Sequence, residues 1–117
     1  MATIDLSQLI TADAKAAAAR AELVEQFRAE IQCHVDAMAI SRRYDSAVSL
    51  ASYIASGNPA WAAEAQAFVT WRDAVWAYAY AELDKVLDGQ RDQPEVGEFI
   101  SELPAMMWPD KLFHATR

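Results

Sequence analysis

The sequence predicts an all-α protein, a small helical bundle with two long and two short helices. Alanine makes up about one residue in five of the 117, whereas the chain contains only three glycines and four prolines. Alanine favours helix because its side chain loses no rotational freedom there, while glycine and proline interrupt helices. Apolar residues also recur with helical spacing, and no run alternates apolar and polar residues over a convincing strand length. A chain of this size forms one domain, to which we assign residues 1–117.

The first long helix is expected from about Ala12 to Ile40, with Thr11 as its N-cap and residues 1–11 as an N-terminal arm. Its apolar side chains fall on one arc of a helical wheel, and acidic and amide side chains fall on the other. The apolar arc contains Leu23, Val24, Phe27, Ile31, His34, Val35 and Met38. The run "ADAKAAAARA" at the head of this helix has little bulk to bury, so this part either projects or packs closely against another helix.

A second, shorter helix is expected between two interruptions of the helical period. The run "SRRYDS" at residues 41–46 ends the first helix, and the second continues to about Ser56. The run "SGNP" then predicts a sharp boundary. Gly57 is expected in the left-handed conformation, Asn58 caps the next helix, and Pro59 suits its first position.

The third helix is predicted from Pro59 to about Asp88, where Gly89 stops it. Pro94 is expected to start a short acidic helix, "PEVGEFISEL", which Pro104 terminates. Residues 104–117 are predicted to form an irregular apolar tail that packs on the bundle.

The distribution of charge argues against nucleic acid and membrane as partners. The formal charge is −7, and seven acids with two bases between Glu82 and Glu102 account for −5 of it. Phosphate binding depends on clustered Lys and Arg, and Arg42-Arg43 is the longest such run. No apolar stretch is long enough to cross a membrane, and the N-terminal residues lack the pattern of a signal peptide.

The most unusual segment is "FVTWRDAVWAYAY" at residues 68–80, inside the third helix. Together with Trp61, its aromatic side chains cover roughly 200° of the helix circumference. One long helix of a small bundle usually buries a narrower stripe. Either the other helices surround this one, or part of its aromatic face is available to a partner.

Arg72 falls in the middle of this aromatic arc and allows two interpretations. Its stem can pack on the rings while its guanidinium meets a carboxylate such as Asp45. Alternatively, it belongs to a protein interface, because Trp, Tyr and Arg dominate interface hot spots. The two interpretations are compatible. The candidate partner-binding residues are Trp61, Phe68, Trp71, Arg72, Trp76, Met107 and Trp108.

We expect no catalytic residue, no cofactor and no metal site, and we conclude that the chain is not an enzyme. Cys33, His34 and Asp36 are too close in sequence to converge on a metal, because adjacent helical residues point about 100° apart. His34 is instead expected at the edge of the core. The histidines and serines form no recognisable catalytic set, and the few glycines form no phosphate-binding loop. A single cysteine forms no internal disulfide and suits a reducing compartment.

Three runs of the sequence resemble small bacteriophage proteins described as tail or tail-fibre assembly proteins. These runs are "IDLSQLITADAKAAAARA", "RRYDSAVSLASYIASGNPAWAAEAQAFVTWRDAVWAYAYAEL" and "ELPAMMWP", which together cover most of the chain. The resemblance implies an all-helical accessory of a phage tail, and it supplies no catalytic residue. Tyr44, Tyr53, Asn58 and the aromatic residues of the third helix belong to the most specific run.

The leading hypothesis is therefore a chaperone-like tail-fibre assembly protein that binds a tail-fibre component in the host cytoplasm during phage assembly. Its contact would be the exposed part of the aromatic face or the apolar tail from Met106 to Phe113. The alternative is a small structural subunit of the phage tail or baseplate that stays in the virion, with the alanine-rich helix packing against copies or neighbours. A homo-oligomer is compatible with both. A third hypothesis is a regulator or inhibitor directed at the host.

Overall fold

The structure, a computed structural model, describes the backbone of residues 6–109 and the side chains from Thr11 onward. This part of the chain is helical and contains no strand, which confirms the all-α prediction with two long and two short helices. One short 3-10 segment, η1, follows the second helix. The elements in chain order are α1 (Leu6–Ser41), α2 (Ala47–Ala51), η1 (Ser52–Ala55), α3 (Pro59–Leu87) and α4 (Val96–Glu102).

Helix α1 begins earlier than the sequence predicted. It starts at Leu6, so Thr11 lies within the helix and is not its N-cap. The physical reason is the absence of any glycine or proline in this region, since nothing there opposes extension of an alanine-rich helix. At 1.5 Å per residue the 36 residues of α1 span about 54 Å.

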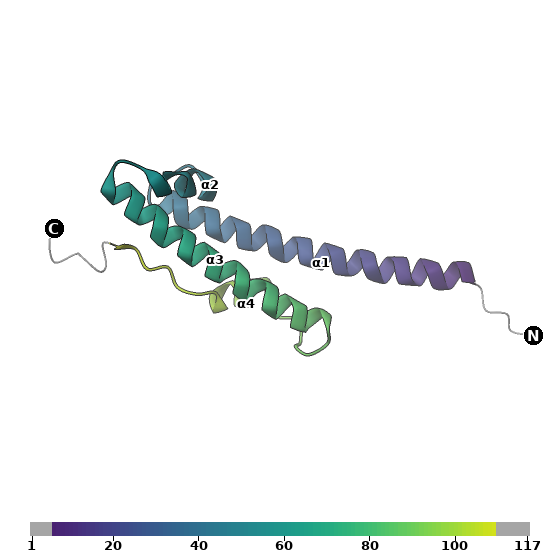
Figure 1. Cartoon of the computed structure of the whole chain (residues 1–117). Helices are drawn as coiled ribbons and strands as arrows, with labels where there is room; N and C mark the ends of the chain where they lie inside the picture. Colours follow the sequence, from purple (N-terminus) through teal and green to yellow (C-terminus); the bar gives the residue numbers. More distant parts are fainter. Residues whose placement is uncertain (1–5, 110–117) are drawn as a thin grey trace, which may run out of the picture.

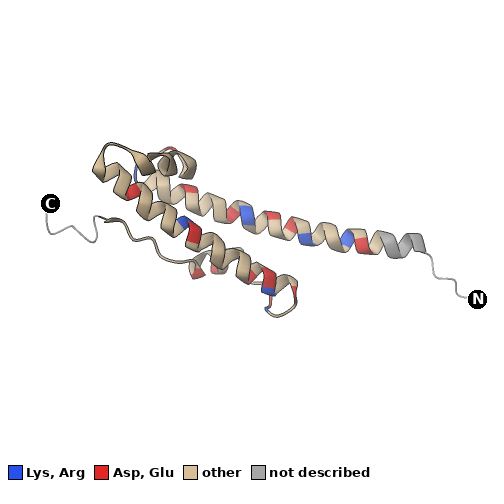
Figure 2. Cartoon of the chain, viewed as in Figure 1, with Lys and Arg blue, Asp and Glu red and all other residues tan. Residues whose placement is uncertain are grey.

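The beginning of α1 projects beyond the bundle, which decides between the two expectations for its alanine-rich head (Figure 1). Every side chain from residue 11 to residue 22 is exposed, Leu23 and Val24 are half-buried, and the first fully buried side chain is Phe27. We call residues 11–22 the α1 arm. Charged residues of both signs are spread along α1, as Figure 2 shows.

Helix α1 ends in a left-handed turn at Arg43, whose φ is 74°. The Arg43 N–H donates to the carbonyl of Ile40 (2.9 Å), and the Tyr44 N–H donates to the carbonyl of Ala39 (3.2 Å). This pair of hydrogen bonds is the Schellman motif, in which glycine is the usual left-handed residue. The expectation of a left-handed Gly57 was wrong, because the turn after η1 closes through Ser56 in an extended conformation.

The ends of α2 and α3 follow from local chemistry. The Ser46 hydroxyl caps α2 by accepting the Ser49 N–H (3.1 Å), and the last turn tightens into η1. Asn58 caps α3 through its side-chain oxygen, and Pro59 occupies the first position, as predicted. Gly89, with φ of 76°, ends α3 within one residue of the predicted boundary.

Helix α4 is shorter than the sequence predicted, since it starts at Val96 and not at Pro94. The chain then runs beside α3 as far as Pro109, with Leu103 and Trp108 buried (Figure 1). The predicted tail comprises residues 104–117, of which the structure describes residues 104–109 beside α3.

One hydrophobic core joins the four helices and the segment after α4. Its largest fully buried side chains are Phe27, Ile31 and Val35 from α1, Leu50 from α2, Phe68 and Val75 from α3, and Phe99 from α4. The rings of Phe27 and Phe99 meet edge to face at 5.3 Å between centroids, which ties α4 to α1. Among the described side chains no polar or charged residue is fully buried.

Candidate functional site

Three of the seven candidate partner-binding residues lie in the core. The exposed fraction is 0% for Phe68, 5% for Trp71 and 7% for Trp108. The Phe68 ring stacks on Trp108 (centroids 6.4 Å apart, planes 12° apart) and contacts Trp71 at 5.6 Å. These residues are unavailable to a partner unless the bundle opens, so the prediction that they form a contact surface needs correction. The reason is that the segment after α4 covers this side of α3.

Trp71 holds that segment in place. Its Nε1–H donates to the carbonyl of Pro104 at 2.7 Å, across 33 positions of sequence. The ring of His34, half-buried as expected, lies 5.7 Å from the Trp71 ring. Burial lowers the pKa of His34 below its usual value, because the charged form loses hydration there.

Arg72 pairs with a carboxylate, though not with the expected Asp45. Its Nη2 lies 3.0 Å from Oδ1 of the adjacent Asp73, on a partly exposed face of α3. Within residues 11–109, the cations placed over aromatic rings are Arg42, 4.5 Å from the Trp108 centroid, and Arg91, 5.5 Å from that of Phe99. Among these described residues, Arg72 is not one of the cations placed over an aromatic ring.

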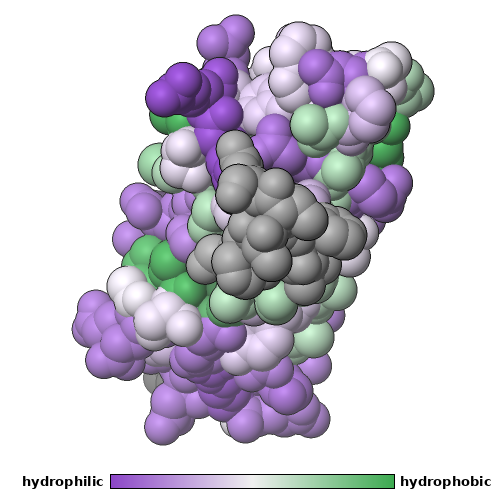
Figure 3. Space-filling model, turned by 90° about the vertical axis from the view of Figure 1, so that its left-hand side faces the viewer, coloured by the Kyte–Doolittle hydropathy of each residue, from purple (hydrophilic) through white to green (hydrophobic). Residues whose placement is uncertain are grey.

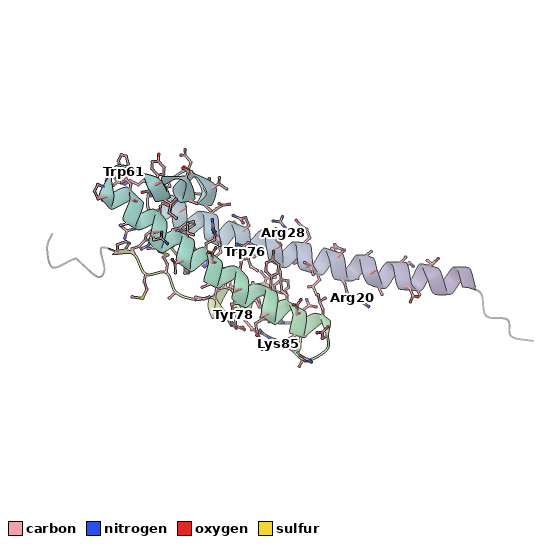
Figure 4. The ribbon with its side chains drawn as sticks, in the orientation of Figure 1. Arg20, Arg28, Trp61, Trp76, Tyr78 and Lys85 are labelled. Carbon is pink, nitrogen blue, oxygen red and sulfur yellow. The ribbon has the colours of Figure 1, made fainter. Side chains whose placement is uncertain are left out.

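The remaining candidates are at least partly exposed, but they do not form one surface. Trp61 is 48% exposed at the start of α3, and Met107 is 59% exposed in the segment after α4. Trp76 is half-buried and packs on Tyr80 at 5.6 Å (Figure 4). Figure 3 looks at the end of the bundle that contains α2 and shows hydrophobic surface in several separate areas. The aromatic arc of α3 is therefore mostly core, with exposed residues at separate points along it.

The exposed Trp61 belongs to a cluster of aromatic residues at this end of the bundle. The Tyr44 and Tyr53 rings meet nearly edge to face at 5.4 Å between centroids, and Tyr53 meets Trp61 in the same way at 5.8 Å. Tyr44 follows the Schellman turn, Tyr53 lies in η1, and Trp61 is in the first turn of α3. Three different elements therefore bring these rings together.

Charged residues complete the walls of an open cavity of about 300 Å³, which we call the aromatic–arginine cavity. It is lined by Arg42, Arg43, Tyr44, Tyr53, Trp61 and Glu64. The Tyr44 hydroxyl donates to one Glu64 carboxylate oxygen at 2.9 Å, and Nη1 of Arg42 lies 3.4 Å from the other. Partial burial and this hydrogen bond raise the pKa of Tyr44 to about 12.

A second hollow of about 520 Å³ runs along α3 beside residues 104–107. Its floor consists mainly of small side chains, including Ala63, Ala67 and Ala74. It is shallow and almost entirely apolar, so it offers contact area but few polar groups to orient a ligand.

Within residues 11–109, no group of three His, Cys, Asp or Glu residues is arranged to hold a metal ion. Cys33 is exposed and has a free thiol. Among the described helices, none is both long enough and apolar enough to cross a membrane.

Comparisons with family models, with curated proteins and with solved structures return no match to this chain. The resemblance to phage tail proteins therefore stays a prediction from the sequence.

Sequence reasoning did not recognise the aromatic–arginine cavity. Tyr44 and Tyr53 appear only as members of the specific run, and Arg42-Arg43 only as a short basic pair. One local signal pointed there: the first helix ends at "SRRY", where no glycine is available for the left-handed turn.

Proposed function

We propose that this chain functions by binding another protein, and that the α1 arm is the principal contact. The observation that carries the proposal is that residues 11–22 contribute no buried side chain to the bundle. The fold does not use these roughly three turns of helix for its own core. Their exposed surface is available for contact with another chain.

The α1 arm is suited to packing against another helix. It continues a helix whose later turns are fixed in the bundle, so the costly nucleation step has already been made and alanine favours extension. Alanine side chains keep the helix surface narrow, which allows a second helix to approach at the short end of the usual 8–10 Å range.

The partner proposed here is a tail-fibre component, bound in the host cytoplasm while the phage tail assembles. The sequence resemblance to small phage tail and fibre-assembly proteins supports this choice of partner.

Co-expression with the neighbouring fibre gene product, followed by co-purification, tests the proposal. The double variant Ala14→Glu/Ala18→Glu places two charges on the α1 arm and should reduce recovery of the fibre protein about tenfold without changing the melting temperature. Ala77→Glu/Ala81→Glu adds the same charges, at the same spacing, to exposed positions of α3 and should leave recovery unchanged. Equal recovery with both variants would contradict a contact through the arm.

A structural subunit of the tail or baseplate remains the alternative, because an exposed helical arm also suits packing between copies in an assembled particle. Mass spectrometry of purified virions separates the two roles. A stoichiometric amount of the chain in the particle would favour the structural subunit over a transient chaperone.

A further inference from the structure

We infer that the aromatic–arginine cavity binds an acidic segment of a partner protein, with a carboxylate side chain on Arg43 and a neighbouring apolar side chain against Tyr53 and Trp61. This inference rests on the proposed protein-binding function, and it names a second contact and the chemistry of the segment that fits it. Arg42, Arg43 and Tyr44 of its lining directly follow the last residue of α1. That end of α1 lies opposite the arm (Figure 1).

Arg43 supplies the cation for this contact. Its side chain is exposed and forms no hydrogen bond or ion pair with another side chain in the described part of the chain. Arg42, in contrast, lies over the Trp108 ring and near Glu64. The six lining residues carry a formal charge of +1, from two arginines and one glutamate, in a chain whose charge is −7. Arg43 is therefore the group in this wall that a carboxylate can pair with.

The backbone of Arg43 gives a second reason to assign it a role. A non-glycine residue is strained in the left-handed region, whereas glycine would form the same Schellman turn without that strain. Within residues 11–109 the Arg43 side chain forms no hydrogen bond or ion pair that would offset this strain. Strained positions of this kind concentrate at binding sites.

The aromatic residues provide the apolar half of the contact. Trp61 keeps about half of its surface exposed, and Tyr53 contacts it edge to face. The Tyr44 hydroxyl is already occupied by Glu64, so its ring packs against Tyr53 as an apolar surface. At about 300 Å³ the cavity is at the lower limit of ligand pockets, which suits one or two side chains of a protein segment better than a cofactor.

A protein carboxylate fits this site better than nucleic acid. A polyanion needs several cations along its path, whereas the described lining of the cavity offers Arg43 as its one cation without an ion pair. A protein segment with one carboxylate next to an apolar side chain can pair with Arg43 and also pack against the rings of Tyr53 and Trp61.

The test uses the full chain and a synthetic peptide with the core Glu-Leu-Asp-Phe, capped at both ends and flanked by glycine and serine. The control peptide has Gln-Leu-Asn-Phe at the same positions. Calorimetry should show the acidic peptide binding about tenfold more tightly, because a hydrogen bond to a charged group contributes this order of affinity. Arg43→Gln should abolish the difference between the peptides, and Arg43→Lys should retain part of it.

Two matched variants separate charge from packing. Arg72→Gln removes a partly exposed arginine elsewhere on the surface and should leave peptide selectivity unchanged. Trp61→Ala should weaken both peptides alike. Equal affinity for the two peptides, or unchanged selectivity in Arg43→Gln, would overturn the inference.

The outcome is independent of the fibre experiment, because peptide binding needs no fibre protein. Loss of fibre recovery in the arm variant with no peptide selectivity would uphold the proposed function and reject the acidic-segment site. Peptide selectivity that Arg43→Gln abolishes, with unchanged fibre recovery in the arm variant, would uphold the acidic-segment site and reject the α1 arm as the principal contact. Concentration-dependent dimers of the full chain that Arg43→Gln abolishes would reassign the cavity to a second copy and overturn the choice of partner.

Discussion

At the scale of single residues, the left-handed turn at Arg43 and the one at Gly89 make a natural pair. Both end a long helix through the same two hydrogen bonds, with φ of 74° and 76° respectively. Only Gly89 has the residue type that this conformation favours. The comparison isolates the energetic cost of a side chain in a Schellman turn.

Arg43→Gly is expected to raise the free energy of unfolding by about 1 kcal/mol, because it relieves this strain. Gly89→Ala should lower it by a similar amount, since open space surrounds the new Cβ and only the backbone conformation is unfavourable. Urea denaturation followed by circular dichroism measures both changes. A destabilised Arg43→Gly would mean that the arginine side chain contributes contacts to the fold.

Trp71 offers a second prediction at this scale. Trp71→Phe keeps an aromatic ring but removes the donor to the Pro104 carbonyl, and should cost about 1–2 kcal/mol of unfolding free energy. Trp76→Phe is the control on the same helix, because Trp76 is half-buried and packs mainly on Tyr80. Thermal unfolding of the two variants should therefore differ, with the larger loss at Trp71. Equal losses would show that the hydrogen bond contributes nothing beyond the size of the ring.

At the scale of elements, α1 has two parts with different roles. The part from Phe27 onward supplies buried side chains to the core, and the arm supplies none. The division follows from side-chain bulk, because alanines keep the helix going without apolar surface large enough to hold a neighbour.

A chain that begins at Glu22 should therefore unfold with a free energy within about 0.5 kcal/mol of the full chain, while its helical circular dichroism falls. A chain that begins at Ala29 also loses Phe27 and its contact with Phe99, and should lose about 3 kcal/mol or more. Chemical denaturation of both truncated chains checks this. A large loss in the first would show that the arm packs on the bundle.

At the scale of the whole molecule, ion pairs join the end of α3 to the segment before α4 and to α4 itself. Arg91 lies 2.7 Å from Glu82 and 2.6 Å from Glu102, and the Tyr78 hydroxyl donates to Glu102 at 2.7 Å. Hydrogen bonds from Lys85 and Arg91 lower the pKa of Glu82, and those from Arg91 and Tyr78 lower the pKa of Glu102. The folded state therefore binds protons at these carboxylates less tightly than the unfolded chain does.

Stability should consequently be complete above the ordinary glutamate pKa and fall as the pH drops below it towards the lowered folded values. The lowered pKa of His34 acts in the same direction at somewhat higher pH. Arg91→Gln should reduce the melting temperature at pH 7. It should also make the melting temperature fall less as the pH is lowered. Arg72→Gln is the control, because Arg72 pairs with the adjacent Asp73 on the same helix and does not join α3 to another element. If the melting temperature falls by the same amount between pH 7 and pH 3 in wild type and in Arg91→Gln, this account is contradicted.

The positions of the helices could be predicted from the sequence because local chemistry determines them. Asn58 with Pro59 starts α3 and Gly89 ends it through contacts within a few residues, and the apolar spacing from Phe27 to Val35 identifies the buried face of α1. What only the tertiary structure decided is which aromatic residues are covered. Trp71 is buried and Trp61 exposed because the segment after α4 reaches one and not the other. The cavity around Arg43 likewise forms only where the turn after α1, η1 and the first turn of α3 pack together. That packing brings together residues far apart in the sequence, so no local sequence pattern predicts it.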